Sequence, residues 1–116
     1  MRVFMLESPP RDIENLDGVA VRADAVECYE ELELAYHLAK RSFERKRNIA
    51  KKFKYEFLLW LSGTRDIRNA VRKTAPEGEC MLILFSGEVE NVKEKRLDLK
   101  KTADLVRLEN ISLSRI

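Results

Sequence analysis

Short apolar runs between turn residues characterise the outer parts of the chain. Residues 2–6 and 18–22 are such runs, and each has the length of one β-strand. Between them, residues 12–16 predict one helical turn. Residues 80–85 are apolar without interruption, which predicts a fully buried central strand. We therefore expect a small sheet.

The middle of the chain has the periodicity of amphipathic helices. Asp24 followed by Glu27 is similar to a capping box and predicts the start of the first helix. Its buried face is expected at positions three and four residues apart. These positions are Leu34, Ala35, Leu38, Ala39, Ser42 and Phe43. Asn48 is the expected break before the next helix.

Two more helices are expected after this break. The buried stripe of the second helix is Phe53, Phe57, Leu58 and Leu61. Gly63 should end that helix, because glycine readily adopts the left-handed conformation that closes many helices. Thr64 can then cap a short third helix. The residues expected to face inward in the third helix are Ile67, Ala70 and Val71.

This order of elements predicts an α+β fold. We expect one domain over residues 1–116, with a small, mostly antiparallel sheet packed against helices. The residues after 88 are highly charged, and the spacing of their apolar residues is ambiguous between strand and helix. For that part we expect a loop or helix followed by one more short element.

The lengths of the apolar runs bear on localisation. The longest are residues 80–85 and 57–61, far below the roughly 20 residues that a membrane span requires. The apolar start of the chain is interrupted by Glu7, so a secretory signal is not expected either. The sequence therefore predicts a cytoplasmic protein that does not enter a membrane.

Cysteine and histidine are too few to suggest a metal centre. Cys28 and Cys80 show no metal-ligand spacing with the single histidine, His37. We expect two reduced, buried thiols and a structural histidine, with no metal ion and no cofactor.

Charge is strongly segregated along the chain, although the formal net charge is only +2. Residues 40–73 hold twelve basic and three acidic side chains, whereas residues 1–39 hold three basic and nine acidic ones. Attraction to phosphates acts over a Debye length of about 10 Å, so a polyanion would respond to the basic segment itself. The segment favours nucleic-acid binding over a merely solvated helix surface.

Motifs of catalysis are scarce. The chain has no glycine-rich phosphate loop and no paired cysteine motif. A small enzyme would have to assemble an acid-base pair from Glu56, Asp66 or His37. We keep this as an alternative, but the sequence favours a binding module.

The most specific stretch of the sequence is residues 56–71, EFLLWLSGTRDIRNAV. A Glu-led apolar helix ends in Leu-Ser-Gly, Arg-Asp-Ile and an Ala-containing helix come next, and an apolar strand follows at residues 80–85. This order resembles the small kinase-binding subunit of the KEOPS complex, the TPRKB family, in its archaeal type. The resemblance covers roughly residues 19–86 and, weakly, residues 103–112. Asp66 stands where the family often has Gln.

The resemblance implies a role in tRNA modification. Members of this family bind the atypical kinase/ATPase subunit of KEOPS and recruit tRNA by its single-stranded CCA end, while another subunit transfers the threonylcarbamoyl group to adenosine. A non-catalytic, regulatory subunit without a cofactor is therefore expected. A generic RNA- or DNA-binding module outside KEOPS is the alternative.

Two sets of residues are candidates for binding these partners. The tRNA-binding candidates are Lys46, Lys51, Lys52, Lys54, Arg65, Arg68 and Arg72. Tyr55 and Trp60 could stack on bases, although a Trp in an apolar helix favours the core. The kinase-binding candidates, whose spacing predicts one helix face, are Leu105, Leu108 and Ile111. The alternative for this second set is packing on the protein's own sheet.

Overall fold

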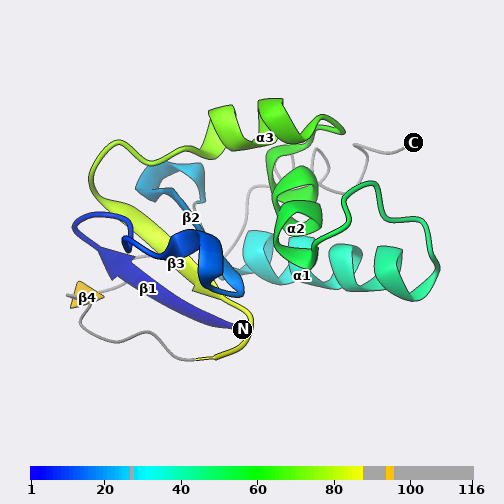
Figure 1. Cartoon of the computed structure of the whole chain (residues 1–116), viewed down its shortest axis with the longest axis horizontal. Helices are drawn as coiled ribbons and strands as arrows, with labels where there is room; N and C mark the ends of the chain where they lie inside the picture. Colours follow the sequence, from blue (N-terminus) through cyan, green and yellow to red (C-terminus); the bar gives the residue numbers. More distant parts are fainter. Residues whose placement is uncertain (27, 88–93, 96–116) are drawn as a thin grey trace. The chain divides into compact units, whose positions relative to one another are not determined.

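The computed structural model describes residues 1–26, 28–87 and 94–95 (Figure 1). The strands are β1 (Arg2–Leu6), β2 (Gly18–Arg22), β3 (Cys80–Leu84) and β4 (Glu94–Lys95). The α-helices are α1 (Tyr29–Glu44), α2 (Phe53–Ser62) and α3 (Ile67–Thr74). Two short 3-10 helices are η1 (Ile13–Asn15) and η2 (Ala23–Ala25). The predicted α+β fold class with a small antiparallel sheet is confirmed.

The described residues divide into two compact units. The sheet unit contains Met1–Ala25 and the described residues from Thr74 onward. The helical unit contains the described residues of Val26–Lys73. That residues 1–116 form one domain, with the sheet packed against the helices, stays a prediction.

The sheet has the strand order β2-β3-β1-β4, and each pairing is antiparallel. The predicted strands at 2–6 and 18–22 and the predicted helical turn near residues 12–16 are confirmed. β3 lies between β2 and β1, and all five of its side chains are buried. An unbroken apolar run suits this position because an inner strand here has no solvent-facing side.

One face of the sheet carries a small apolar cluster. Its buried members are Leu6, Cys80 and Leu82. The partly buried side chains of Phe4, Ile13 and Ala20 pack against it. Ile13 comes from η1, so the single helical turn between β1 and β2 covers part of this face.

The helical unit is built on the packing of α1 with α2 (Figure 1). Ala35 and Ala39 are both fully buried on α1, and small side chains four residues apart allow close approach of another helix. Gly63 ends α2 with φ of 69°, as predicted. Leu34 and Leu38 are only half-buried, whereas Leu32 is fully buried, so the core face of α1 is rotated from the predicted one.

The predicted starts of two helices are wrong. Asp24 does not cap α1, because it lies in η2 and its carboxylate pairs with the guanidinium of Arg22 at 3.2 Å. The residue before α1 is Cys28, and Glu27 lies outside the described residues. For α3, the cap is Asp66 instead of Thr64: the amide of Arg68 donates to the Asp66 carboxylate at 2.9 Å.

The orientation of α3 also differs from the prediction. Ala70 is buried as expected, but Ile67 is 38% and Val71 42% exposed. The buried row of this helix is Ala70 and Thr74, four residues apart, and the row of Ile67 and Val71 lies beside it. An eight-residue helix that buries one row of small side chains leaves the neighbouring row open to solvent.

None of the helices that the structure describes is long and apolar enough to cross a membrane.

Candidate nucleic-acid interface

Eight of the exposed cations of the basic segment fall into two groups in the helical unit, and Lys40, Arg41 and Lys73 are exposed outside both groups. The first group, here called the loop cations, lies in the connection between α1 and α2. It consists of Arg45, Lys46, Arg47, Lys51 and Lys52, all exposed. The second group, the α3 arginines, consists of Arg65, Arg68 and Arg72, also exposed.

The two groups lie at opposite ends of α2 (Figure 1). The connection leads into the first residue of α2, Phe53, and the α3 arginines follow its last residue, Ser62. A ten-residue α-helix is about 15 Å long, at about 1.5 Å per residue. Along the chain, α2 therefore separates the loop cations from the α3 arginines.

Lys54 belongs to neither group, which corrects its predicted place on the basic surface. Its side chain is only 6% exposed, and its Nζ lies 5.6 Å from the centroid of the Tyr55 ring. The reason is that α2 is buried nearly all round, with seven of its ten residues buried. A helix of this kind has little solvent-facing surface for a lysine at its second position.

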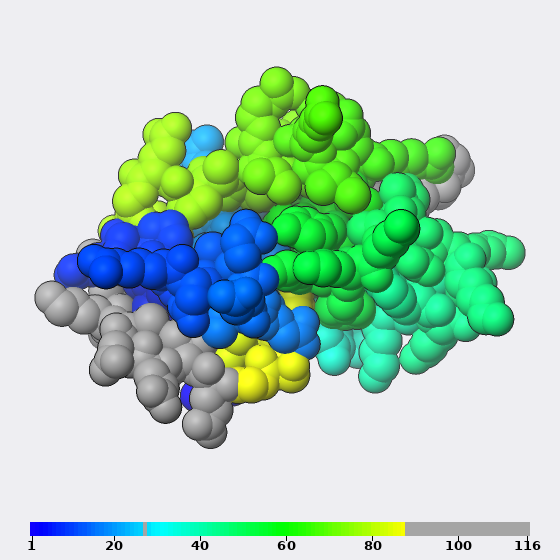
Figure 2. Space-filling view, in the orientation of Figure 1, coloured from blue at the N-terminus to red at the C-terminus, as the bar shows by residue number. Residues whose placement is uncertain are grey.

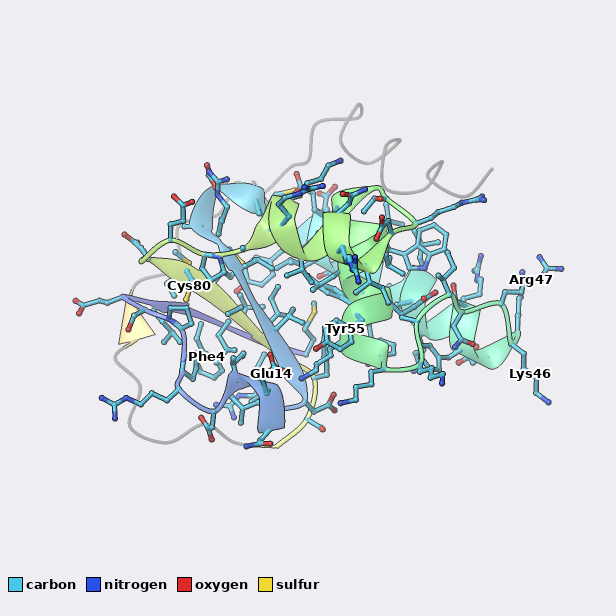
Figure 3. The ribbon with its side chains drawn as sticks, turned by 45° about the horizontal axis from the view of Figure 1, so that its top comes forward. Phe4, Glu14, Lys46, Arg47, Tyr55 and Cys80 are labelled. Carbon is cyan, nitrogen blue, oxygen red and sulfur yellow. The ribbon has the colours of Figure 1, made fainter. Side chains whose placement is uncertain are left out.

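The first part of the connection is fixed by the end of α1. The amide of Arg47 donates to the carbonyl of Ser42 at 2.8 Å, and the amide of Lys46 donates to that of Phe43 at 3.2 Å. This pair of bonds is the Schellman arrangement that closes helices. Lys46 takes its left-handed residue, with φ of 56°. Lys46 and Arg47 extend from this turn away from the ribbon (Figure 3).

A buried carboxylate fixes the middle of the connection. Oε1 of Glu56, a residue of α2 with no exposed surface, accepts hydrogen bonds from the amides of Ile49 at 2.9 Å and Ala50 at 3.0 Å. The side-chain amide of Asn48 donates to the carbonyl of Ala50 at 2.7 Å. The backbone between the loop cations is therefore held from α2 and from within the loop.

The loop cations are not neutralised by neighbouring acids. Among the residues that the structure describes, none of these five side chains forms an ion pair. The space-filling view shows the end of α1 and the start of the connection on the right-hand side of the helical unit (Figure 2). The charge of the loop cations is thus available to an external anion.

The α3 arginines differ from the loop cations because two of them lie on a helix, beside exposed apolar side chains. Arg68 and Arg72 are four residues apart and share one side of the helix. Arg72 also donates a hydrogen bond to the side chain of Asn69. The exposed apolar row of Ile67 and Val71 adjoins this side, so the α3 surface combines cations with apolar area.

Trp60 does not form the stacking platform that the sequence left open. It is 7% exposed, and its indole Nε1–H donates to the hydroxyl of Ser42 at 3.1 Å. Tyr55 is half-buried beside Lys54.

A cluster of half-buried aromatic rings, which the sequence analysis missed, lies near the connection. The Phe53 ring is 5.6 Å from Tyr36 and 5.8 Å from Phe43, centroid to centroid. The spacing of Tyr36 and Phe43 could have revealed this cluster, because residues seven apart lie on the same side of a helix.

The three residues of the enzyme alternative serve different structural roles. Glu56 binds backbone amides of the connection, and Asp66 caps α3. His37 is exposed on α1, with its ring 5.8 Å from that of Tyr36. Within the described residues, no hydrogen bond or ion pair joins these three side chains to one another.

Both cysteines are free and buried, as predicted. Burial raises the pKa of the Cys80 thiol, and the negative charge of Glu79 adds to this effect. Within residues 1–26, 28–87 and 94–95, no group of three or more His, Cys, Asp or Glu side chains could hold a metal ion. The kinase-binding candidates Leu105, Leu108 and Ile111 lie outside the described residues.

Comparison of the sequence with protein-family models and with curated proteins finds no match.

Proposed function

We propose that this protein is a non-catalytic, cytoplasmic tRNA-binding subunit of KEOPS type, which binds the atypical kinase/ATPase subunit and recruits tRNA for threonylcarbamoyladenosine formation. The observation that supports tRNA binding most strongly is the loop cations: five exposed positive side chains on a connection whose backbone is held by hydrogen bonds. The KEOPS assignment and the kinase partner rest on the sequence resemblance.

A polyanion fits the loop cations better than a small anion does. The five exposed side chains are spread over an eight-residue connection. Several separate cations suit a ligand with several separate phosphates, since each contact releases counterions from the nucleic acid. Engagement of five phosphates would give a salt dependence with a log-log slope of about −3.5 to −4.5.

The α3 arginines extend this proposal to a second surface of the helical unit. A tRNA end is long enough to pass along α2, and the arginines at its far end offer guanidinium groups suited to phosphates. Arginine guanidinium planes can also stack on unstacked bases, and the adjoining row of Ile67 and Val71 adds exposed apolar area beside them.

The test is binding of the full chain to fluorescently labelled tRNA over a range of salt concentrations. We expect tight binding at low salt, a steep loss of affinity with added salt, and weaker binding to tRNA that lacks the CCA end. Equal binding to tRNA with and without that end, and to duplex DNA, would favour the generic nucleic-acid-binding module. No binding at low salt would reject the tRNA-binding role.

The kinase part of the proposal has a separate test. Purified KEOPS kinase/ATPase subunit should co-elute with the chain in size-exclusion chromatography. Two separate peaks at micromolar concentrations of both proteins would reject that part.

A further inference from the structure

We infer that the connection between α1 and α2, residues 45–52, is a preorganised phosphate-docking loop and that Glu56 is its positioning residue. This inference rests on the proposed function for its ligand, the tRNA backbone. Glu56 contacts no ligand in this arrangement. It acts through the amides of Ile49 and Ala50, which lie between the two halves of the loop cations.

The connection is held at three successive places. The Schellman bonds hold Lys46 and Arg47 against the end of α1. The carboxylate of Glu56 then holds the amides of Ile49 and Ala50. Asn48 holds the Ala50 carbonyl. Cations stand on both sides of the held segment, so their attachment points keep fixed positions relative to one another.

A simple connection between two packed helices does not require these features. A carboxylate with no exposed surface carries a desolvation penalty, which a connection held only by the ends of its two helices would not incur. A left-handed Lys is also sterically less favourable than glycine, which the chain uses at the equivalent position of α2, Gly63 with φ of 69°. At the end of α1 the chain places a charged side chain in that position instead.

Fixed attachment points lower the conformational-entropy cost of binding the tRNA backbone. A mobile loop must lose conformational freedom when its cations engage phosphates, whereas a held loop has already lost it on folding. Ile49 is 46% exposed while its amide is bound to Glu56, so hydrogen bonding and not burial of its side chain holds this residue, whereas Ala50 is both bonded and buried.

The charge of Glu56 makes the inference testable, because a charge effect and a positioning effect change the affinity for tRNA in opposite directions. If the loop acted through net charge alone, removal of a carboxylate beside five cations would strengthen binding to tRNA. If Glu56 positions the loop, replacement by a side chain without an acceptor weakens binding although the protein becomes more positive. Glu56→Gln separates the two effects, because its carbonyl oxygen can still accept from both amides.

The experiment measures affinity and salt dependence of the full chain for labelled tRNA in Glu56→Leu, Glu56→Gln and the wild type. We expect Glu56→Leu to bind about 3- to 10-fold more weakly, the cost of ordering the loop upon binding, with a shallower salt slope. Glu56→Gln should bind at least as tightly as the wild type. Glu44→Gln is the matched control: it removes an exposed carboxylate at the last residue of α1 and should not weaken binding.

Asn48→Ala keeps the inference falsifiable if Glu56→Leu does not fold. Asn48 is half-buried and its replacement removes one loop bond while leaving both helices intact. We expect the same direction of change, weaker binding and a shallower salt slope, with an unchanged circular-dichroism spectrum.

The failure of this inference is distinguishable from that of the proposed function. If the wild type does not bind tRNA, the proposed function fails, and the docking role fails with it. If the wild type binds with a steep salt slope but folded Glu56→Leu, or Asn48→Ala in its place, binds as tightly or more tightly, the positioning role alone is overturned. Equal weakening by Glu56→Gln and Glu56→Leu would also overturn it.

Discussion

The indole N–H of Trp60 donates to the hydroxyl of Ser42 at 3.1 Å, and that hydroxyl donates to the Leu38 carbonyl at 2.9 Å. The two residues come from α2 and α1 and are both buried. Ser42 therefore satisfies a polar group of the neighbouring helix within the core of the helical unit. The same residue's carbonyl accepts from Arg47, so the packing of α2 and the start of the basic connection meet at Ser42.

Removal of the Ser42 hydroxyl should destabilise the protein through Trp60. We expect Ser42→Ala to cost about 1 to 3 kcal/mol, because the buried indole N–H loses its acceptor. In a Trp60→Phe background the same change should cost less than about 1 kcal/mol, since no indole N–H remains. Urea unfolding of the four proteins of this cycle checks the difference. Equal costs in both backgrounds would show that the bond contributes nothing.

Truncation of Phe57 should be among the most damaging changes. Phe57 is fully buried in α2 and was predicted from its position in the apolar stripe. Phe57→Ala should lower the free energy of unfolding by about 3 to 5 kcal/mol, the usual range for loss of a buried aromatic ring. A loss below about 1 kcal/mol in denaturant unfolding would contradict the packing of α2.

Gly18 should not tolerate even a methyl group. A Cβ at this position would lie 2.5 Å from the Ile83 carbonyl oxygen, which belongs to the backbone of β3 and cannot move without disturbing the sheet. We expect Gly18→Ala to cost about 1 to 3 kcal/mol, the usual penalty of overpacking. Thermal unfolding of Gly18→Ala and the wild type measures this cost, and an unchanged or raised melting temperature would contradict the close approach of β2 to β3 at this position.

Glycine at position 46 should stabilise the fold. Lys46 has φ of 56°, and a non-glycine residue in this region carries a penalty of roughly 1 to 2 kcal/mol. The greater freedom of glycine in the unfolded chain offsets about 0.4 to 1 kcal/mol of that gain. We therefore expect Lys46→Gly to raise stability by roughly 0 to 1.6 kcal/mol in urea unfolding, with Lys46→Ala as the control that removes the charge but keeps the strain. A less stable Lys46→Gly variant would show that the lysine side chain itself stabilises the turn.

The strands and the ends of helices were predicted well where a few neighbouring residues determine them. The apolar run of β3 has no polar interruption, and it occupies the inner position that such a run suits. Gly63 ended α2 as expected, since few other residues adopt its backbone conformation readily. The cap of α3 was missed by two residues because both Thr64 and Asp66 can accept from a backbone amide, and only the three-dimensional course of the chain selects between them.

The candidate site was predicted only in part, because its arrangement depends on distant contacts. Periodicity placed Lys54 on an outer face, but α2 is buried on nearly all sides, which a single helix pattern does not reveal. The role of Glu56 depends on the amides of Ile49 and Ala50, and backbone amides have no sequence signal. The charge count identified the basic segment but not its division by α2.

The division of the basic segment leads to a prediction about tRNA binding. The loop variant Lys51→Ala/Lys52→Ala and the α3 variant Arg65→Ala/Arg68→Ala each remove two exposed cations, one pair from each end of α2. If both pairs contact phosphates, each variant should make the log-log salt slope shallower by about 1.4 to 1.8. The two losses in binding free energy should add in the quadruple variant, because the groups are separated by the length of α2, about 15 Å.

The matched control for this comparison is Lys40→Ala/Arg41→Ala, which removes two exposed cations from α1 outside both groups. General attraction between a positive protein and a polyanion would make all three double variants equivalent. Direct phosphate contact would instead leave the salt slope of the α1 variant near that of the wild type and change the other two. Fluorescence titrations with labelled tRNA at several salt concentrations measure these slopes. Unchanged affinity and slope in the α3 variant would remove Arg65 and Arg68 from the interface and restrict tRNA binding to the loop cations.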